Sequence, residues 1–193
     1  MENYIQQITN LRQQKDQDVA SNSLHWINLV GLFPLKDGEN TFGSDENNDI
    51  ILPQFPNPLC GSFIVQDSEV TLQPKAEIKI DFRGNPLKTD ASDEADLINI
   101  ASLAMKIIIR GGRPMLRIWD REAEQKNHFT GFHYYPIKPE YKVTAKFVRY
   151  DSPKPIIITE VIGTQVEKFL LGEAQFTLNG HSCTLIAEKK WRQ

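Results

Sequence analysis

The sequence predicts an all-β fold, or at least a mainly β one, with one short N-terminal helix. Short runs rich in Val, Ile, Phe, Thr and Tyr recur along most of the 193 residues, and Asp-Gly, Gly-Gly and Asn-Gly pairs separate many of them. Short strands divided by turn residues at regular intervals are typical of β-sandwiches and barrels. Apolar residues with a helical period occur only near the start of the chain.

The first element is the predicted helix. Residues Tyr4 to Lys15 place Ile5, Ile8 and Leu11 on one helical stripe and surround it with polar side chains. We expect three parts in the chain, and as an alternative the two β parts form one continuous domain. These are a helix and linker (1–22), a β-sandwich (23–120) and a second small β lobe (121–193).

A first hairpin can be aligned residue by residue. Gly111-Gly112 suits a two-residue turn that needs positive φ. Counting outward from this turn pairs Arg110 with Arg113, Ile108 with Met115, Lys106 with Arg117, and Ala104 with Trp119. The other face is wholly apolar, so we expect it in the core; it carries Leu103, Met105, Ile107, Ile109, Pro114, Leu116 and Ile118.

A second hairpin turns at Asn179-Gly180, which sets Phe176 opposite Cys183 and Ala174 opposite Leu185. We therefore interpret Cys183 as an inert core thiol rather than a nucleophile. The two cysteines lie too far apart for a CxxC metal or redox motif.

Composition narrows the classes of function. The formal net charge of −3 argues against nucleic-acid binding, which depends on attraction to phosphates. No stretch approaches the roughly 18 apolar residues of a membrane-spanning helix, and we expect no membrane association. The first residues lack the apolar core of a signal peptide, so the chain as written is expected to be cytoplasmic. We expect no cofactor and no metal, because His128 and His133 would point to opposite faces of one strand.

The stretch "GENTFGSDENNDIILP" allows several interpretations. Asp45, Asn47 and Asp49 have the spacing that opens a calcium loop, but Ile50 and Pro56 stand where that loop needs Gly and Glu. We favour a structural role, because Asp and Asn side chains bond their own nearby backbone in turns between strands.

The same stretch resembles forkhead-associated domains, which are β-sandwiches with an Asn-Asp-Ile-x-Leu segment. Gly43, Asn48 and the residues after it match, whereas Ser44 replaces the arginine that helps that family bind phosphothreonine. "NPLCGSF" stands where the family carries Ser-x-x-His. The resemblance implies the sandwich topology without phosphothreonine recognition.

A wider resemblance joins three segments in order: "LVGLFPLKDGENTFGSDENNDIILP", "IIIRGGRPMLRIWD" and "FTGFHYYPIKPEYKVTAKFVRY". Together they resemble the bacterial family called domain of unknown function 1684, from about Trp26 to about Leu185. That family implies no particular activity. Its pattern continues beyond "EKKWRQ", so we expect its C-terminal part to be missing here, and exported relatives leave the localisation open.

Basic side chains gather on one face of the first hairpin. Lys106 and Arg117 are expected to lie directly opposite each other, and like charges in that position destabilise a strand pair. The compensating charge is either an internal carboxylate or an anionic ligand. The carboxylate would be Asp120 or Glu122 from the same strand end, or an acid from elsewhere in the chain. Arginine forks bind carboxylate and phosphate groups in two-point contacts.

These observations leave three functions open. The first is a binding module for a small anionic ligand or partner, contacted by Lys106, Arg110, Arg113 and Arg117 and oriented by Asp120. The second is a hydrolase with its site between the two β parts, using Asp120 or a histidine as general acid or base. The third is a structural interaction domain whose sheet edge pairs with another chain. No nucleophile motif is visible, and the oligomeric state stays open.

Overall fold

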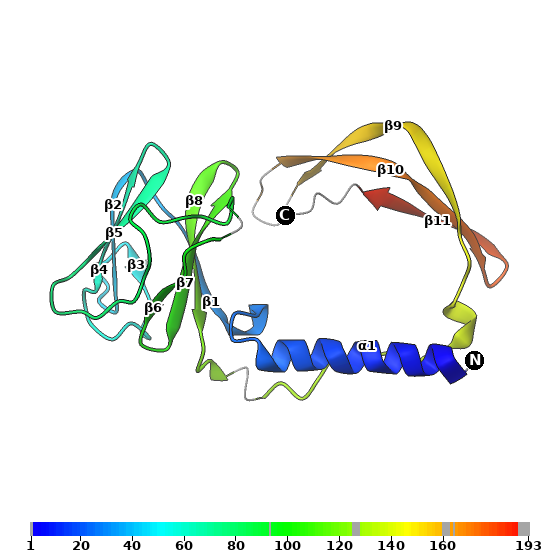
Figure 1. Cartoon of the computed structure of the whole chain (residues 1–193), viewed down its shortest axis with the longest axis horizontal. Coiled ribbons are helices and arrows are strands. Elements are labelled where there is room, and N and C mark those ends of the chain that lie inside the picture. Colours follow the sequence, from blue (N-terminus) through cyan, green and yellow to red (C-terminus); the bar gives the residue numbers. More distant parts are fainter. Residues whose placement is uncertain (1, 93, 125–127, 160–162, 164, 189–193) are drawn as a thin grey trace. The chain divides into compact units, whose positions relative to one another are not determined.

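The computed structural model of the chain describes residues 2–92, 94–124, 128–159, 163 and 165–188. Within these residues it contains one α-helix, α1 (Glu2–Ser21), and three β-sheets (Figure 1). The predicted mainly β fold with an N-terminal helix is confirmed. The helix extends beyond the predicted Lys15, because residues 16–21 include neither Gly nor Pro to end it.

The chain forms two compact units, which we describe separately. One comprises residues 15–132 and is called the sandwich unit; the other comprises residues 1–14 and 133–193 and is called the three-stranded unit. The helix α1 contributes residues to both. The predicted division at residues 22 and 120 stays a prediction.

The sandwich unit contains two four-stranded sheets, preceded by the short helix η1 (Trp26–Asn28). Sheet A has, in spatial order, β1 (Leu29–Pro34), β8 (Arg113–Asp120), β7 (Leu103–Arg110) and β6 (Ile98–Ile100). Sheet B has β3 (Ile50–Ile51), β2 (Gly38–Gly43), β4 (Gly61–Gln66) and β5 (Glu69–Pro74).

One apolar core lies between these sheets. Phe42 and Phe63 from sheet B are fully buried in the same cluster as Met105, Leu116 and Ile118 from sheet A. The sheets therefore pack face to face as a sandwich. The predicted core face of the first hairpin is confirmed, except that Ile109 near the turn is only partly buried.

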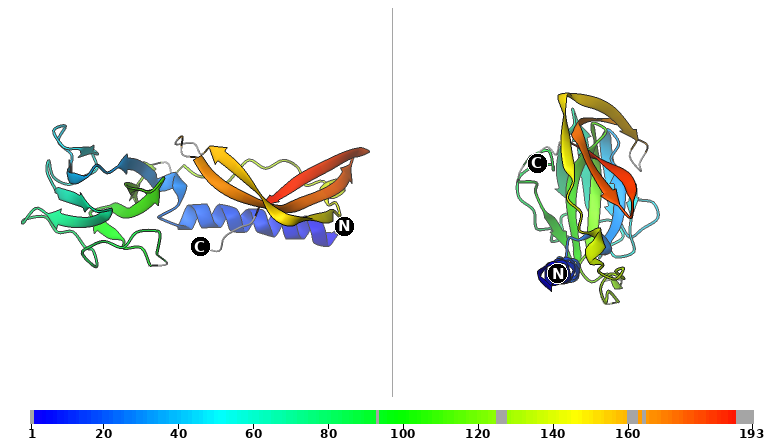
Figure 2. Two further views of the ribbon diagram at one scale, coloured as in Figure 1. Left: turned by 90° about the horizontal axis from the view of Figure 1, so that it is seen from above. Right: turned by 90° about the vertical axis from the view of Figure 1, so that its right-hand side faces the viewer.

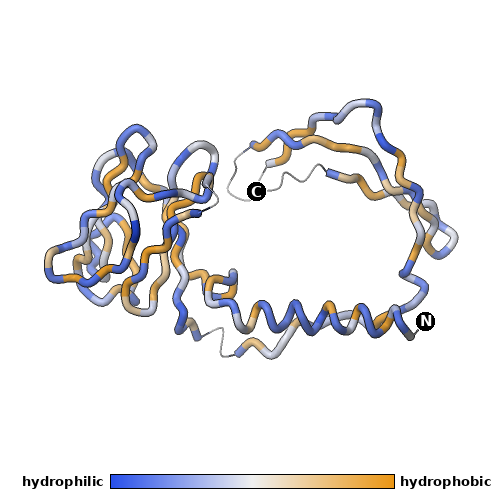
Figure 3. The backbone as a smooth tube through the Cα atoms, in the orientation of Figure 1, coloured by the Kyte–Doolittle hydropathy of each residue, from blue (hydrophilic) through white to orange (hydrophobic). Residues whose placement is uncertain are grey.

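The three-stranded unit contains η2 (Pro139–Tyr141) and a sheet in the order β11 (His181–Glu188), β10 (Gln165–Leu178) and β9 (Lys146–Thr159). Figure 2 shows the strong twist of this sheet, and Figure 3 shows hydrophobic residues along its strands. Among its described residues only Gly172 is buried. Phe147 and Leu185 are 52% and 64% exposed, so the described part of this unit encloses no core comparable with that of the sandwich.

The register of the second hairpin is as predicted, with Phe176 opposite Cys183 and Ala174 opposite Leu185. The interpretation of Cys183 as a core thiol is wrong, because this residue is only partly buried. The fully buried cysteine is Cys60, in the sandwich unit.

The acidic residues between β2 and β3 hold turns, in agreement with the structural interpretation. The Asp45 carboxylate accepts the Asn47 backbone N–H at 2.9 Å. Asp49 is paired with Lys36 and accepts the Thr41 backbone N–H at 2.9 Å. These contacts lower the pKa of Asp49 below the ordinary aspartate value, the Lys36 hydrogen bond contributing most.

We expect Asp49→Asn to lower the melting temperature slightly at neutral pH. A lowered pKa means that the folded protein prefers the charged carboxylate, so the stabilisation is present above the ordinary value of 3.8 and is lost as the pH falls below it. Melting curves across pH measure this effect, with the exposed Asp37→Asn as control. A difference from wild type that persists unchanged in strong acid would contradict it.

Candidate functional site

The face of sheet A that points away from the core carries a row of basic side chains. The strands pair as predicted, with Lys106 opposite Arg117 and Arg110 opposite Arg113 at the turn. Because side chains alternate along a strand, these four residues share the outer face with Arg121. We call these five residues the cationic face.

One carboxylate neutralises part of this charge. Asp90, from the loop between β5 and β6, pairs with Arg110 at 2.7 Å between Nη1 and Oδ2. Its other oxygen accepts the Ile109 backbone N–H at 2.8 Å. The internal ion pair expected as one alternative from the sequence therefore exists for Arg110, and its acid comes from elsewhere in the chain rather than from Asp120 or Glu122.

Arg117 is not compensated in this way. Its Nε atom is buried and has no hydrogen-bond partner among the described residues. Burial, and then repulsion from Arg110, lower the pKa of Arg117, while Asp90 has the opposite effect. The guanidinium carbon lies 5.8 Å from the centre of the Trp119 ring. Neither Arg117, Lys106 nor Arg113 forms an ion pair with any residue that the structure describes.

The structure does not bring Asp120 to this group. Asp120 follows Leu116 and Ile118 in alternation, which places it on the core side of β8. It is buried, and its carboxylate accepts the Glu122 backbone N–H at 3.0 Å, which closes the turn after the strand.

Arg121 is a functional candidate that the sequence-based prediction missed. Its backbone N–H donates to the Ser102 carbonyl at 3.0 Å, so the strand pairing continues by one residue beyond β8. Its guanidinium donates to the side-chain oxygen of Asn99. Extending the alternation from Arg117 and Trp119 by two positions would have found it.

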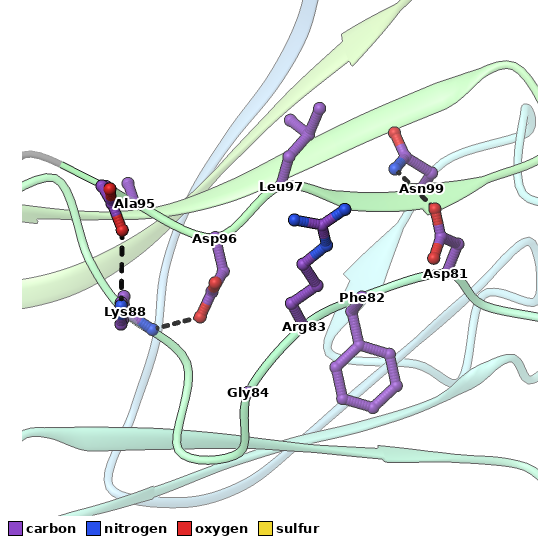
Figure 4. A pocket seen from close by; sticks show the side chains of 10 residues that line it. Asp81, Phe82, Arg83, Gly84, Lys88, Ala95, Asp96, Leu97 and Asn99 are labelled. Atoms are coloured by element: carbon purple, nitrogen blue, oxygen red, sulfur yellow. Dashed lines mark hydrogen bonds and ion pairs between the residues drawn. The ribbon is translucent and has the colours of Figure 1, made fainter.

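A cavity of about 730 Å³ lies beside the edge strand β6. Asn99 lines this cavity, where its amide donates to Asp81 at 3.3 Å. Its side-chain oxygen accepts the hydrogen bond from Arg121, which connects the cavity with the cationic face. Figure 4 shows Arg83 extending across the space between the two segments that form its walls. Lys88 in this cavity is paired with Glu94 at 3.7 Å, whereas Arg83 forms no ion pair with a described residue.

Asp90→Asn is expected to lower the free energy of unfolding by about 1–2 kcal/mol, because it weakens a part-buried, charge-assisted contact with Arg110 and Ile109. Urea denaturation measures this change. Asp67→Asn, at an exposed turn, should leave the unfolding free energy nearly unchanged. Equal stability of wild type and Asp90→Asn would show that this contact does not hold the loop.

The described residues contain no group of three His, Cys, Asp or Glu side chains placed to hold a metal ion. No helix in the described part of the chain is long and apolar enough to cross a membrane.

Residues 127–192 match the family described as "Protein of unknown function (DUF1684)". This match supports the resemblance to that family for the C-terminal third of the chain. No curated protein and no solved structure shows a significant match. The cationic face precedes the matched residues, and the likeness to forkhead-associated domains stays a prediction.

Proposed function

We propose that the sandwich unit is a binding module for a small ligand that carries a phosphate or carboxylate group, held by Lys106, Arg113 and Arg117. The observation that carries this proposal is the buried Nε of Arg117, which lacks a partner among the described residues. An anion at this position would accept that N–H and would offset the repulsion between Lys106 and Arg117.

The neighbouring groups suit this role. Of the four basic side chains of the hairpin, only Arg110 forms an ion pair with a described residue, Asp90, so the outer face of sheet A keeps an excess of positive charge. Asp90 fixes Arg110 at the end of the hairpin, and Asn99 fixes Arg121 at the other end. The cavity beside β6 offers space for the uncharged part of the ligand, next to Arg83.

The proposal also includes the relation of this chain to two protein families. We infer that the whole chain belongs to the DUF1684 family and that its sandwich is a divergent relative of forkhead-associated domains. In support, the matching residue Gly43 packs so closely on Pro58 and Leu59 that an added Cβ would lie 2.9 Å from the Leu59 Cα. The matching Asn48 donates to the Pro58 carbonyl at 2.6 Å.

Calorimetric titration with inorganic phosphate, citrate and neutral glycerol tests this function. We expect saturable binding of an anion and none of glycerol, and about tenfold or greater weakening in Arg117→Met, since a charge-assisted hydrogen bond is lost. Arg149→Ala, at an exposed position in the other unit, is the control and should bind as wild type does.

Two outcomes would contradict the binding module. If no anion binds, or if Arg149→Ala weakens binding as much as Arg117→Met does, the cationic face is not a specific site. Steady turnover of a phosphoester would instead favour the hydrolase.

A second candidate function concerns the three-stranded unit. Ile157, Leu185 and Ile186 are 66%, 64% and 61% exposed on its strands, which favours an interaction domain. Size-exclusion chromatography with light scattering tests this idea by showing whether the chain associates with itself. A monomer at all concentrations would argue against self-association.

A further inference from the structure

A groove in the three-stranded unit lies between the first turns of α1 and the segment before and within η2. Its volume is about 620 Å³, and its lining includes Tyr4, Arg12, Tyr135, Lys138 and Tyr141. All of these belong to the same compact unit. A hydrogen bond of 3.3 Å from the Tyr134 hydroxyl to the Arg12 carbonyl fastens the segment to the helix.

Basic groups are held against aromatic rings in and around this groove. The Arg12 guanidinium lies 4.7 Å from the centre of the Tyr134 ring, and the Lys138 amine lies 5.8 Å from that of Tyr141. The Lys142 amine lies 5.5 Å from the Tyr4 ring. Such contacts place a cation without neutralising it.

The charge of the groove is one-sided. Of the described residues that line it, Arg12 and Lys138 are basic and none is acidic. Glu140 is the acidic residue of η2, and it does not line the groove. Neither Arg12 nor Lys138 forms an ion pair within the described part of the chain. An occupant that complements this lining carries negative charge.

The tyrosines of the groove indicate the chemistry of the uncharged part of the occupant. Tyr135 is 89% exposed and Tyr141 is 51% exposed, so their rings present apolar faces and hydroxyl groups to solvent. Aromatic rings prefer to pack on other rings in offset or edge-to-face contacts. Tyrosine and arginine, together with tryptophan, are also enriched among the side chains that contribute most to binding at protein interfaces.

We propose that this groove binds a small planar aromatic anion, an aromatic ring that carries a phosphate or carboxylate group. The ring packs against Tyr135 and Tyr141, and the anionic group lies beside Arg12 and Lys138. This site is independent of the cationic face, since all of its residues belong to the other unit.

Calorimetric titration of the full chain with phenyl phosphate tests the proposal, in the Arg117→Met background so that the cationic face does not contribute. We expect saturable binding that weakens about tenfold or more in Arg12→Gln and in Tyr135→Ala, since each loses one of the two kinds of contact. The exposed ring of Tyr135 makes its removal harmless to folding, which circular dichroism verifies. Arg149→Ala is the matched control and should bind normally.

Titrations with inorganic phosphate and with benzyl alcohol test recognition of the anionic group and recognition of the aromatic ring separately. We expect each to bind about tenfold or more weakly than phenyl phosphate, because each offers one element alone. Equal affinity for inorganic phosphate would overturn the aromatic specificity. Absence of binding, or binding that ignores both groove variants, would overturn the site. Tighter binding of a neutral proline-rich peptide would overturn the assignment in favour of a peptide groove.

Discussion

Replacement of Arg117 by methionine is expected to raise the free energy of unfolding of the ligand-free protein by about 1 kcal/mol, although it removes a charged residue from a sheet. Burial lowers the pKa of Arg117, which means that folding disfavours its charge. The guanidinium stays protonated at neutral pH, so the native state bears this cost. Methionine keeps an unbranched apolar chain beside Trp119 and removes the unpartnered Nε.

Urea denaturation at neutral pH measures this gain. Arg113→Met, at the exposed end of the same strand, is the control and should change the unfolding free energy by less than about 0.5 kcal/mol. A clear loss of stability in Arg117→Met would mean that the guanidinium is satisfied in the free protein. A residue that destabilises the ligand-free protein but is needed to bind the ligand shows the pattern expected of a binding residue.

Phe63→Ala is expected to lower the free energy of unfolding by about 3–5 kcal/mol, a larger change than any of the surface substitutions should produce. Phe63 is completely buried between the two sheets, and its ring centre lies 4.9 Å from that of Phe42. Truncation removes buried apolar surface and leaves a cavity in a closely packed core. Differential scanning calorimetry measures the change.

Phe147→Ala is the matched control, because it makes the same substitution on an exposed strand. Phe147 is 52% exposed, and we expect its loss to cost less than about 1 kcal/mol. A cost as large as that of Phe63→Ala would show that the apolar residues of β9, β10 and β11 are covered in solution. An equally small cost for both variants would contradict the single core between the sheets.

Much of the fold followed from local rules. The turn at Gly111-Gly112 determined all four outer-face pairs of the first hairpin. The turn at Asn179-Gly180 likewise determined the predicted strand pairs of the second hairpin. A two-residue turn leaves no freedom of register, so counting outward was sufficient. The apolar alternation of β7 and β8 then identified the core face of sheet A.

The rest depended on contacts between distant residues. Asp90 lies 20 positions before Arg110, and no local sequence pattern indicates that these two residues pair. The side of Asp120 could have been predicted, because this residue shares the even positions of Leu116 and Ile118. The exposure of Cys183 could not have been predicted. The alternation of side chains shows which residues share a face of a sheet, but not whether another layer covers that face.

The most direct test of the anion site observes the Arg117 side chain itself. Its Nε–H group gives a separate signal in ¹H–¹⁵N correlation spectra, which can be followed while inorganic phosphate is added. We expect this signal to move with saturation, together with the backbone signals of Lys106 and Trp119, because the buried donor gains an acceptor. If the Arg117 Nε–H signal stays in place while phosphate shifts signals elsewhere, the anion binds at another site and the cationic face is not the binding surface.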